Sequence, residues 1–267
     1  MRFLDLSIKS KLEENELCFC SLWTSQLNVR DCADIFINKK LSQDYFFNRL
    51  NIKHCNNIKS TLEECIEIQH TRNKMNCYIY IANTEENDSK LEKILTKKGF
   101  NQIDVLQISV LRSDNPYNDK NDKKYTSGDA RDIRVTTINK GLIGQWSELF
   151  STSFKVPEWR YEVEKIMNVN FDRLLLLVSY LKNKPAGCCA LLSKNRVTGL
   201  YCLGTLSSFR HRGLARMMIL KCTQIAREQG SEFLLIQNFS SEKLIQFYRK
   251  NRFKTLYKKK VYALYHQ

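Results

Sequence analysis

Glycine and proline are scarce in this sequence. The chain has 267 residues, of which nine are glycine and three are proline, and residues 1–112 contain a single glycine, Gly99. A glycine-rich turn that brings the backbone close to a ligand is therefore excluded from residues 1–112. Apolar runs of 18 residues are also lacking, and residues 1–10 have no apolar leader, so we expect neither a membrane-spanning helix nor a secretion signal.

Acidic residues are missing from one long stretch. From Leu174 to Arg227 there is no Asp or Glu, although nine Lys and Arg residues lie there. The whole chain has a formal net charge of +15. Such an uncompensated positive field predicts an anionic ligand or partner, which could be a small molecule, a nucleic acid, a membrane surface or an acidic substrate.

Metal-site patterns are also lacking. The ten cysteines include the pairs Cys18/Cys20 and Cys188/Cys189, but neither has the spacing of a zinc site, and the chain has only four histidines. Without a leader, ten cysteines predict reduced thiols in the cytoplasm rather than disulfides. We therefore expect a cytoplasmic protein that binds no metal.

Residues 203–216 are the stretch that carries the clearest chemistry. An apolar strand pattern, Leu200–Leu206, is followed by the turn Arg210-His211-Arg212-Gly213 and then by an apolar helical periodicity. A turn of this kind aims successive backbone N–H groups at one point, at the N-terminus of a helix whose dipole favours an anion. The pattern predicts a phosphate-binding turn; the alternative is a strand followed by a capped, basic surface helix.

Two motifs resemble a known family. Residues 210–215, Arg-x-x-Gly-x-Ala, resemble the R/Q-x-x-G-x-G/A signature of the GNAT-type N-acetyltransferases, and residues 240–253 resemble the later helix of that family. The resemblance covers residues 131–267. Arg252 stands where the family usually has glycine, so we expect Asn251 to take the left-handed conformation instead. Ser241 stands where the family often has asparagine.

The element order supports an α/β fold with a mixed sheet. After residue 130, periodicity predicts a strand, two helices, three strands, a helix, a strand, a helix and a strand. The expected ranges are 131–138, 140–154, 158–167, 174–181, 186–192, 197–206, 212–229, 233–237, 241–250 and 261–264. The family resemblance implies a GNAT-like fold for this half.

The first half resembles a degenerate copy of the second. Leu91–Leu111 aligns without a gap on Leu244–Leu264, each segment giving a short helix, a Lys-x-x-Phe exit and a strand, and Leu95 falls where Tyr248 stands. Two unrelated helix–strand units are the alternative. Upstream, helices are predicted at 32–50 and 58–71 and a strand at 77–82. We expect a smaller GNAT-like domain at 1–112, a linker at 113–130 and a GNAT domain at 131–267.

The resemblance also implies the cofactor and the residues that hold it. In this family the turn binds the diphosphate of acetyl-coenzyme A through backbone amides, while the preceding strand and the next strand hold the pantetheine arm. The cofactor-binding residues implied are Leu203, Gly204, Thr205, Arg210, His211, Arg212, Gly213, Leu214, Ala215, Arg216, Asn238 and Ser241. Tyr248 corresponds to the general acid that protonates the departing sulfur, with a core tyrosine as the alternative.

These features predict an acyl-CoA-dependent N-acyltransferase. The expected reaction transfers acetyl from acetyl-CoA to a primary amine by direct attack in a ternary complex. The amine would belong to a small molecule or a peptide, and the chain could form a homodimer. The alternatives are a non-catalytic CoA-binding module, and a nucleic-acid-binding module that uses Lys254 and Lys258–Lys260. No aromatic residues are interleaved with these lysines in a recognised nucleic-acid-binding motif, so nucleic acid is the less favoured partner.

Overall fold

The computed structural model describes residues 6–42, 44–52, 58–82, 86–114 and 132–266. The chain divides into two compact units, each built from several segments. Unit 1 contains Met1–Glu16, Val110–Ile236 and Tyr248–Lys254; unit 2 contains Leu17–Ser109, Gln237–Phe247 and Thr255–Gln267. Each unit therefore takes segments from both halves of the sequence. The predicted linker, 113–130, lies outside the described residues from position 115 onwards, and the predicted domain boundaries stay predictions.

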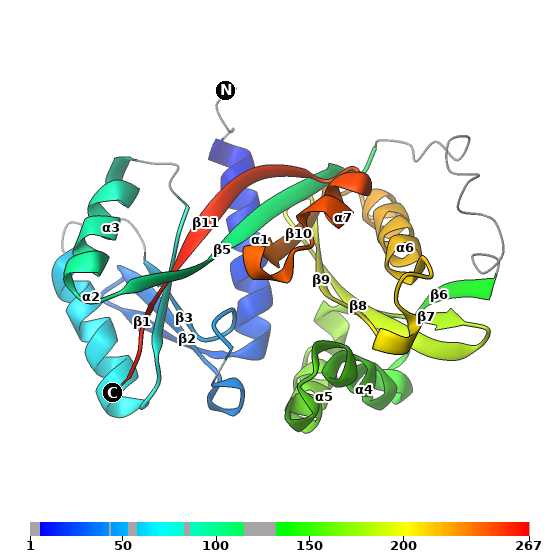
Figure 1. The fold of residues 1–267 in the computed structure, drawn as a ribbon, viewed down its shortest axis with the longest axis horizontal. Coiled ribbons are helices and arrows are strands. Elements are labelled where there is room, and N and C mark those ends of the chain that lie inside the picture. The colour runs from blue at the N-terminus through cyan, green and yellow to red at the C-terminus, as the bar shows by residue number, and fades with distance from the viewer. Residues whose placement is uncertain (1–5, 43, 53–57, 83–85, 115–131, 267) are drawn as a thin grey trace. The chain divides into compact units, whose positions relative to one another are not determined.

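Unit 1 consists of a sheet of strands β6 to β10 and the helices α4, α5 and α6. Its strands follow the order β10-β9-β8-β7-β6, all neighbours antiparallel except the parallel pair β9 and β10. The elements are β6 (Ile133–Thr137), α4 (Ile143–Phe154), α5 (Arg160–Val169), β7 (Leu175–Leu181), β8 (Lys184–Lys194), β9 (Val197–Thr205), α6 (Leu214–Glu228) and β10 (Phe233–Phe239), followed by α7 (Ile245–Lys250). Both β10, from Gln237 onwards, and α7, up to Phe247, extend into unit 2. This order confirms the prediction for the second half, and it is drawn in green to orange in Figure 1.

The core of unit 1 forms where α4 packs on the sheet. Trp146 of α4 is fully buried, and its indole N–H donates to the Cys189 carbonyl of β8 at 2.9 Å. Leu176, Leu177 and Val178 of β7 are also buried, as expected for a central strand with a continuous apolar run. The indole bond satisfies the polar atom of a large side chain, which allows complete burial.

Unit 2 contains most of the first half of the chain, the segment Gln237–Phe247 and nearly all of the last strand. Its strand order is β1-β2-β3-β4-β11-β5, so the C-terminal strand lies between two strands of the N-terminal half. Lys260–Leu264 of β11 pairs antiparallel with Cys77–Ile81 of β4. The elements are α1 (Leu6–Trp23), β1 (Ser25–Val29), β2 (Ala33–Ile37), β3 (Arg49–Ile52), α2 (Ile58–Glu67), β4 (Cys77–Ile81), α3 (Glu86–Lys97), β5 (Asn101–Arg112) and β11 (Lys254–Leu264), of which α1, β5 and β11 are shared with unit 1.

One predicted helix is wrong. Residues 32–50 form two strands, β2 and β3, separated by a short 3-10 turn that begins after Asn38. The first four residues of β2 are all buried, so this strand has no polar face and lacks the alternation that reveals a half-buried strand. The Asn38 side chain accepts from the Lys40 N–H at 3.0 Å and closes the turn between the strands. The helices and strands predicted at 58–71 and 77–82 are confirmed.

The two halves end their last helices in the same way. Phe100 N–H donates to the Leu95 carbonyl at 3.1 Å, and Phe253 N–H donates to the Tyr248 carbonyl at 3.0 Å. The residue before each phenylalanine is left-handed: Gly99 has φ +86° and Arg252 has φ +67°. The left-handed residue is thus Arg252, not Asn251 as expected, because the aligned position of the helix end dictates the conformation whichever side chain is there.

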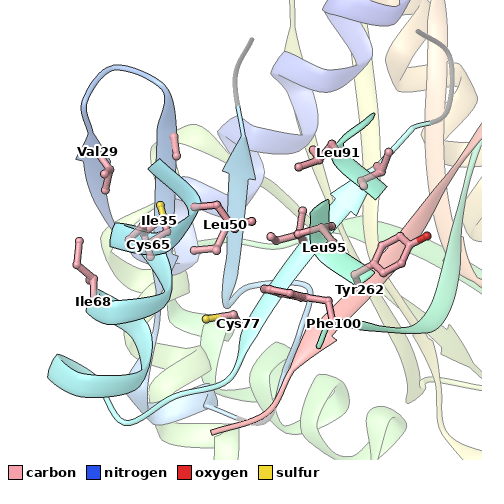
Figure 2. Packing of buried hydrophobic residues seen from close by; sticks show 14 residues of the cluster. Val29, Ile35, Leu50, Cys65, Ile68, Cys77, Leu91, Leu95, Phe100 and Tyr262 are labelled. Atoms are coloured by element: carbon pink, nitrogen blue, oxygen red, sulfur yellow. The ribbon is translucent and has the colours of Figure 1, made fainter. Parts of the chain in front are cut away.

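Leu95, the counterpart of Tyr248, belongs to the core of unit 2. It is fully buried in a cluster that joins α2, α3, β2, β3 and β4 with Tyr262 of β11 (Figure 2). Burial raises the pKa of the cluster thiols Cys65 and Cys77 to about 12, so both stay protonated at neutral pH. Leu95, the residue aligned with Tyr248, is therefore an apolar core side chain, and the two thiols of its cluster are neutral.

The N-terminal helix is tied into unit 1 by one amide. Asn15 of α1 is fully buried; its Nδ2 donates to the carbonyls of Leu192 and Val197, each at 3.0 Å, and its Oδ1 accepts from the Tyr201 hydroxyl at 2.8 Å. The amide closes the turn between β8 and β9. Residues far apart in sequence thus share one buried polar network.

Substitution of Asn15 tests this network. Asn15→Ala removes three buried hydrogen bonds, and we expect the free energy of unfolding to fall by about 3 kcal/mol. The matched control is Glu14→Ala, which removes an exposed hydrogen bond to Asn195 and is expected to cost less than about 0.5 kcal/mol. Urea unfolding followed by circular dichroism measures both; equal losses would contradict the role of Asn15.

Candidate functional site

Strand β9 contains a bulge close to its C-terminal end. Its register with β8 shifts between Cys188 and Ala190, which face Gly204 and Tyr201 respectively. The two β9 residues between those positions therefore face a single β8 residue, and Cys202 adopts a left-handed conformation with φ +55°. A bulge bends the strand and increases its twist.

Beyond this bulge, β9 has an edge without a partner strand among the described residues of unit 1. The parallel register with β10 starts at Phe233 opposite Val197 and ends at Ile236 opposite Leu200. Because Leu206 N–H donates to the Ala186 carbonyl of β8, strand alternation directs the backbone groups of Leu203 and Thr205 away from β8. Polar backbone groups at such an edge are ready to bind an extended ligand.

Gly204 lies where helix α4 meets this strand. A Cβ atom at position 204 would lie 2.8 Å from Ser153 Cβ and 3.1 Å from a ring carbon of Phe154, too close for any other residue. Glycine thus allows the last turn of α4 to pack directly on β9. The sequence offered no sign of Ser153 or Phe154 at this place, since the contact joins residues about fifty positions apart.

Arg210 closes the turn that follows β9. Its Nε donates to the Thr205 carbonyl at 3.2 Å and its Nη2 to the Ser153 carbonyl at 3.3 Å. The guanidinium therefore joins the end of the strand to the end of α4. This side chain shapes the turn, which agrees with the expectation that the turn offers its backbone rather than its side chains.

Two residues of the turn that precedes α6 adopt a left-handed backbone conformation. His211 has φ +62° and Gly213 has φ +87°, and both are exposed. The first helical hydrogen bond runs from Met217 N–H to the Gly213 carbonyl at 3.0 Å. No side chain caps the helix and no acidic residue occurs in its first turn. Amides at the start of α6 are thus directed outwards at the positive end of the helix dipole.

Leu214 anchors the helix N-terminus from the opposite side. It is buried with Leu181 and Ala186 of the sheet, and Ile133 and Phe209 pack against this cluster. Next to it, the Arg212 guanidinium lies 5.9 Å from the centre of the Phe209 ring. The apolar anchor fixes the direction of α6, while a cation stays on the exposed side of the turn.

Residues 174–227 surround the turn and contain no acidic side chain, so the carboxylates that pair with their cations come from other parts of the chain. Lys182 and Arg196 make ion pairs, at 3.8 Å and 3.1 Å, with Asp132 and Glu232, which both lie outside residues 174–227. Arg210 uses its guanidinium on carbonyls. An anion at the start of α6 therefore meets a positive field and a positive helix end together.

Tyr248 lies in α7 and is almost completely buried. Its exposed fraction is 4%, and its ring meets that of Phe253 in a T-shaped contact with centres 5.8 Å apart. Residues 203–205, 210–216 and Tyr248 belong to unit 1. The burial of Tyr248 is compatible with both the predicted acid and the core alternative, and its role stays a prediction.

Asn238 and Ser241, also predicted to bind the cofactor, belong to unit 2. Asn238 is buried, and its Nδ2 donates to the Phe239 carbonyl at 3.2 Å. Ser241 is exposed, and its Oγ donates to Oδ2 of Asp104 at 2.6 Å. Asp104 is a partner that sequence reasoning missed, because it is 137 positions away along the chain.

Within the part of the chain that the structure describes, no three His, Cys, Asp or Glu side chains gather in a way that could hold a metal ion. None of the described helices has the length and apolar character needed to cross a membrane. The nine cysteines with described side chains are all free, and His54 and Cys55 lie outside the described residues.

The turn at residues 210–213 lies in a region that matches a known protein family. Residues 143–253 match the model of the acetyltransferase (GNAT) family. Residues 143–253 are therefore a GNAT-family region of this chain. The GNAT region runs from the start of α4 to the end of α7 and includes the β9 bulge, the turn and Tyr248. No curated protein matches the chain.

Solved structures extend the likeness to the first half. A GCN5-related N-acetyltransferase from Sphaerobacter thermophilus is 12% identical with a TM-score of 0.68, covering 87% of this chain and 75% of its own. Another, from Kribbella flavida, is 11% identical with a TM-score of 0.64, covering 98% and 96%. A tandem GNAT protein from the clavulanic acid biosynthesis pathway is 10% identical with a TM-score of 0.58, covering 81% and 74%. At these identities the likeness shows the fold, and it supports a GNAT-like first half.

The left-handed turn can be tested before any ligand is used. Gly213 and Gly230 flank α6, both with positive φ, and neither has a heavy atom closer than 3.8 Å to an added Cβ. Gly213→Ala and Gly230→Ala are therefore each expected to lower the free energy of unfolding by about 1 kcal/mol, from backbone strain alone. Urea denaturation measures the loss; a neutral Gly213→Ala would contradict the left-handed turn.

Proposed function

We propose that the chain is an acyl-CoA-dependent N-acyltransferase that transfers acetyl from acetyl-CoA to a primary amine. The observation that carries this proposal is the left-handed Gly213 before the uncapped N-terminus of α6, directly after a strand with an open edge. The first feature suits a diphosphate and the second suits an extended arm with amide groups. Both occur inside the region that matches the GNAT family.

Residues 203–205 and 210–216 would hold the cofactor together with Asn238 and Ser241. Backbone amides at the start of α6 would bind the diphosphate. The backbone groups of Leu203 and the Thr205 N–H would bind the pantetheine arm, because the Thr205 carbonyl already accepts from Arg210. His211 and Arg212 contribute their amides, and the Arg212 guanidinium adds a positive charge. When bound, acetyl-CoA supplies an acyl group activated as a thioester.

Direct attack by the amine is favoured over an acyl-enzyme. The hydrogen bond to Cys222 and burial raise the pKa of Cys189, and burial raises the pKa of Cys188, so both thiols stay neutral near the bulge. A neutral buried thiol is a poor nucleophile. In the proposed ternary complex, the nitrogen of the neutral amine bonds to the carbonyl carbon and its extra proton passes to solvent. The carbon–sulfur bond breaks, the sulfur takes the proton of the Tyr248 hydroxyl, and the Tyr248 phenolate takes a proton back from solvent.

The acceptor amine is proposed to belong to a small molecule or a peptide. A lysine-like amine has a pKa near ~10.4 and must lose a proton before attack. Cytoplasmic location and a homodimer stay predictions. A non-catalytic CoA-binding protein is the alternative, and a chain that binds the cofactor yet transfers no acetyl group to any amine would establish it.

Calorimetric titration with acetyl-CoA tests the cofactor site. We expect micromolar binding by the wild type and at least about tenfold weaker binding by Gly213→Glu, whose carboxylate would repel the diphosphate. Gly230→Glu is the matched control, because it adds the same charge at a positive-φ glycine at the other end of α6. Absence of binding by the wild type would refute the acyltransferase proposal, and salt-dependent nucleic-acid binding would be examined next.

Tyr248→Phe tests the general acid. With a panel of primary amines and a thiol reagent that reports released CoA, we expect kcat to fall about 100-fold while the Kd for acetyl-CoA changes less than twofold. Tyr262→Phe, at another buried tyrosine, is the control and is expected to retain kcat. An unchanged kcat for Tyr248→Phe would assign Tyr248 to the core.

A further inference from the structure

Strand β6 is an edge strand of unit 1. It comes last in the strand order, and among the described residues it pairs only with β7 (Figure 1). Ile138 N–H donates to the Leu176 carbonyl at 3.0 Å, and Lys182 N–H donates to the Asp132 carbonyl at 3.1 Å. Because backbone groups alternate along an antiparallel strand, the odd-numbered residues of β6 direct their backbone groups away from β7. These residues are Ile133, Val135 and Thr137.

The side chains of β6 do not protect this edge. Edge strands often carry lysine or proline, which discourage the addition of another strand, and β6 has neither. The one cation of β6, Arg134, lies with its guanidinium 4.6 Å from the centre of the Tyr180 ring. Tyr180 donates to the Gln145 side chain of α4 at 3.1 Å, so Arg134 lies on the face of the sheet that α4 covers. The opposite face, towards α6, receives no charge from β6.

A groove with a volume of about 470 Å³ lies between β6 and the C-terminal half of α6. This volume is within the range of roughly 300–1,000 Å³ that is common for ligand sites. Residues 135–137 of β6 and Leu175 of β7 line one side. Lys221, Ile225 and Glu228 line the other side, and their spacing of four and three residues puts them on one face of α6. The helix therefore presents an apolar residue between a cation and a carboxylate.

The two charges on this face of α6 make no ion pair among the described residues. Lys221 Nζ donates to Oε1 of Gln224 at 3.3 Å, and Gln224 Nε2 donates to Oε1 of Glu228 at 2.7 Å. The Gln224 amide is neutral, so it cancels neither charge. Lys221 therefore favours an acidic group on a ligand, and Glu228 favours a basic one.

We infer that the groove between β6 and α6 binds an extended peptide segment of another protein, which adds a strand to β6. Side chains on one face of a strand recur about every 6.7 Å, so three of them span about 13 Å. Lys221 and Glu228 are separated by about 10 Å along α6, and their long side chains cover the difference. The segment therefore carries an acidic, an apolar and a basic residue at alternate positions, opposite Lys221, Ile225 and Glu228. This inference does not depend on acetyl-CoA binding.

A synthetic peptide tests the groove. The probe is the fluorescently labelled heptapeptide Thr-Glu-Thr-Val-Thr-Lys-Thr, which has the required alternation and threonines that favour a strand. Fluorescence anisotropy is expected to give a Kd below about 1 mM, and at least about fivefold weaker binding when glutamine replaces both charged residues of the probe. Val135→Pro removes an outward N–H and no hydrogen bond to β7, and we expect it to weaken binding at least about fivefold.

A charge reversal tests the recognition of the probe by α6. In Lys221→Glu both ends of the groove are acidic, so we expect the probe to bind about tenfold more weakly than to the wild type. A peptide with lysine at both charged positions is expected to bind this variant more tightly than it binds the wild type. Arg227→Glu makes the same charge change at an exposed residue of α6 that does not line the groove, and as the matched control it is expected to bind the probe within about twofold of the wild type.

Hydrogen exchange locates the bound peptide. The amides of Ile133, Val135 and Thr137 are expected to exchange within seconds in the free protein and at least about tenfold more slowly with the probe. Slow exchange without the probe would show that this chain or a second copy of it covers β6, and would overturn the inference. Absence of binding, or equal binding by the wild type and Lys221→Glu, would also overturn it. If Val135→Pro does not fold, the comparison with Lys221→Glu decides.

Discussion

The antiparallel pairing of β11 with β4 is the constraint on which the arrangement of this chain depends. Five residues near the C-terminus pair with five residues of the N-terminal half, and β11 lies between β4 and β5 in the strand order of unit 2. A single missing central strand would leave unpaired backbone groups on both of its neighbours. The two halves of the sequence, which resemble each other, are therefore not two independently complete sheets. Each compact unit needs residues from both.

Periodicity predicted most of the second half because its elements have a distinct apolar face or a continuous apolar core. The helix after Gly213 and the buried strand at 175–181 are of this kind. The strand β2 was missed because its residues are mostly buried, and the run 32–50 then has no alternation to set it apart from a helix. A buried strand is identified from sequence when its apolar run is continuous, as at 175–181, whereas Asp34 interrupts the shorter run of β2.

Backbone conformations and distant contacts were less accessible from sequence. Cys202 is left-handed because of a bulge against β8, and nothing in its side chain indicates this. Arg252 is left-handed because the helix ends there. Its alignment with Gly99 indicates this conformation, whereas the arginine side chain does not. The turn at Gly213 was found because glycine, basic residues and helical periodicity coincide, whereas the bond from Ser241 to Asp104 joins positions that no local pattern relates.

The position of β11 also has a consequence for the order of synthesis. A chain emerging from the ribosome completes β4 and β5 long before residues 254–264 exist. The edge of β4 therefore stays unpaired while the roughly 180 residues between Ile81 and Lys260 are synthesised. During that interval the edge is open to any other extended segment, including one from a neighbouring nascent chain. A polypeptide truncated before residue 254 would keep this edge of β4 unpaired. Such a product would be a target for chaperones and proteases rather than a smaller working protein.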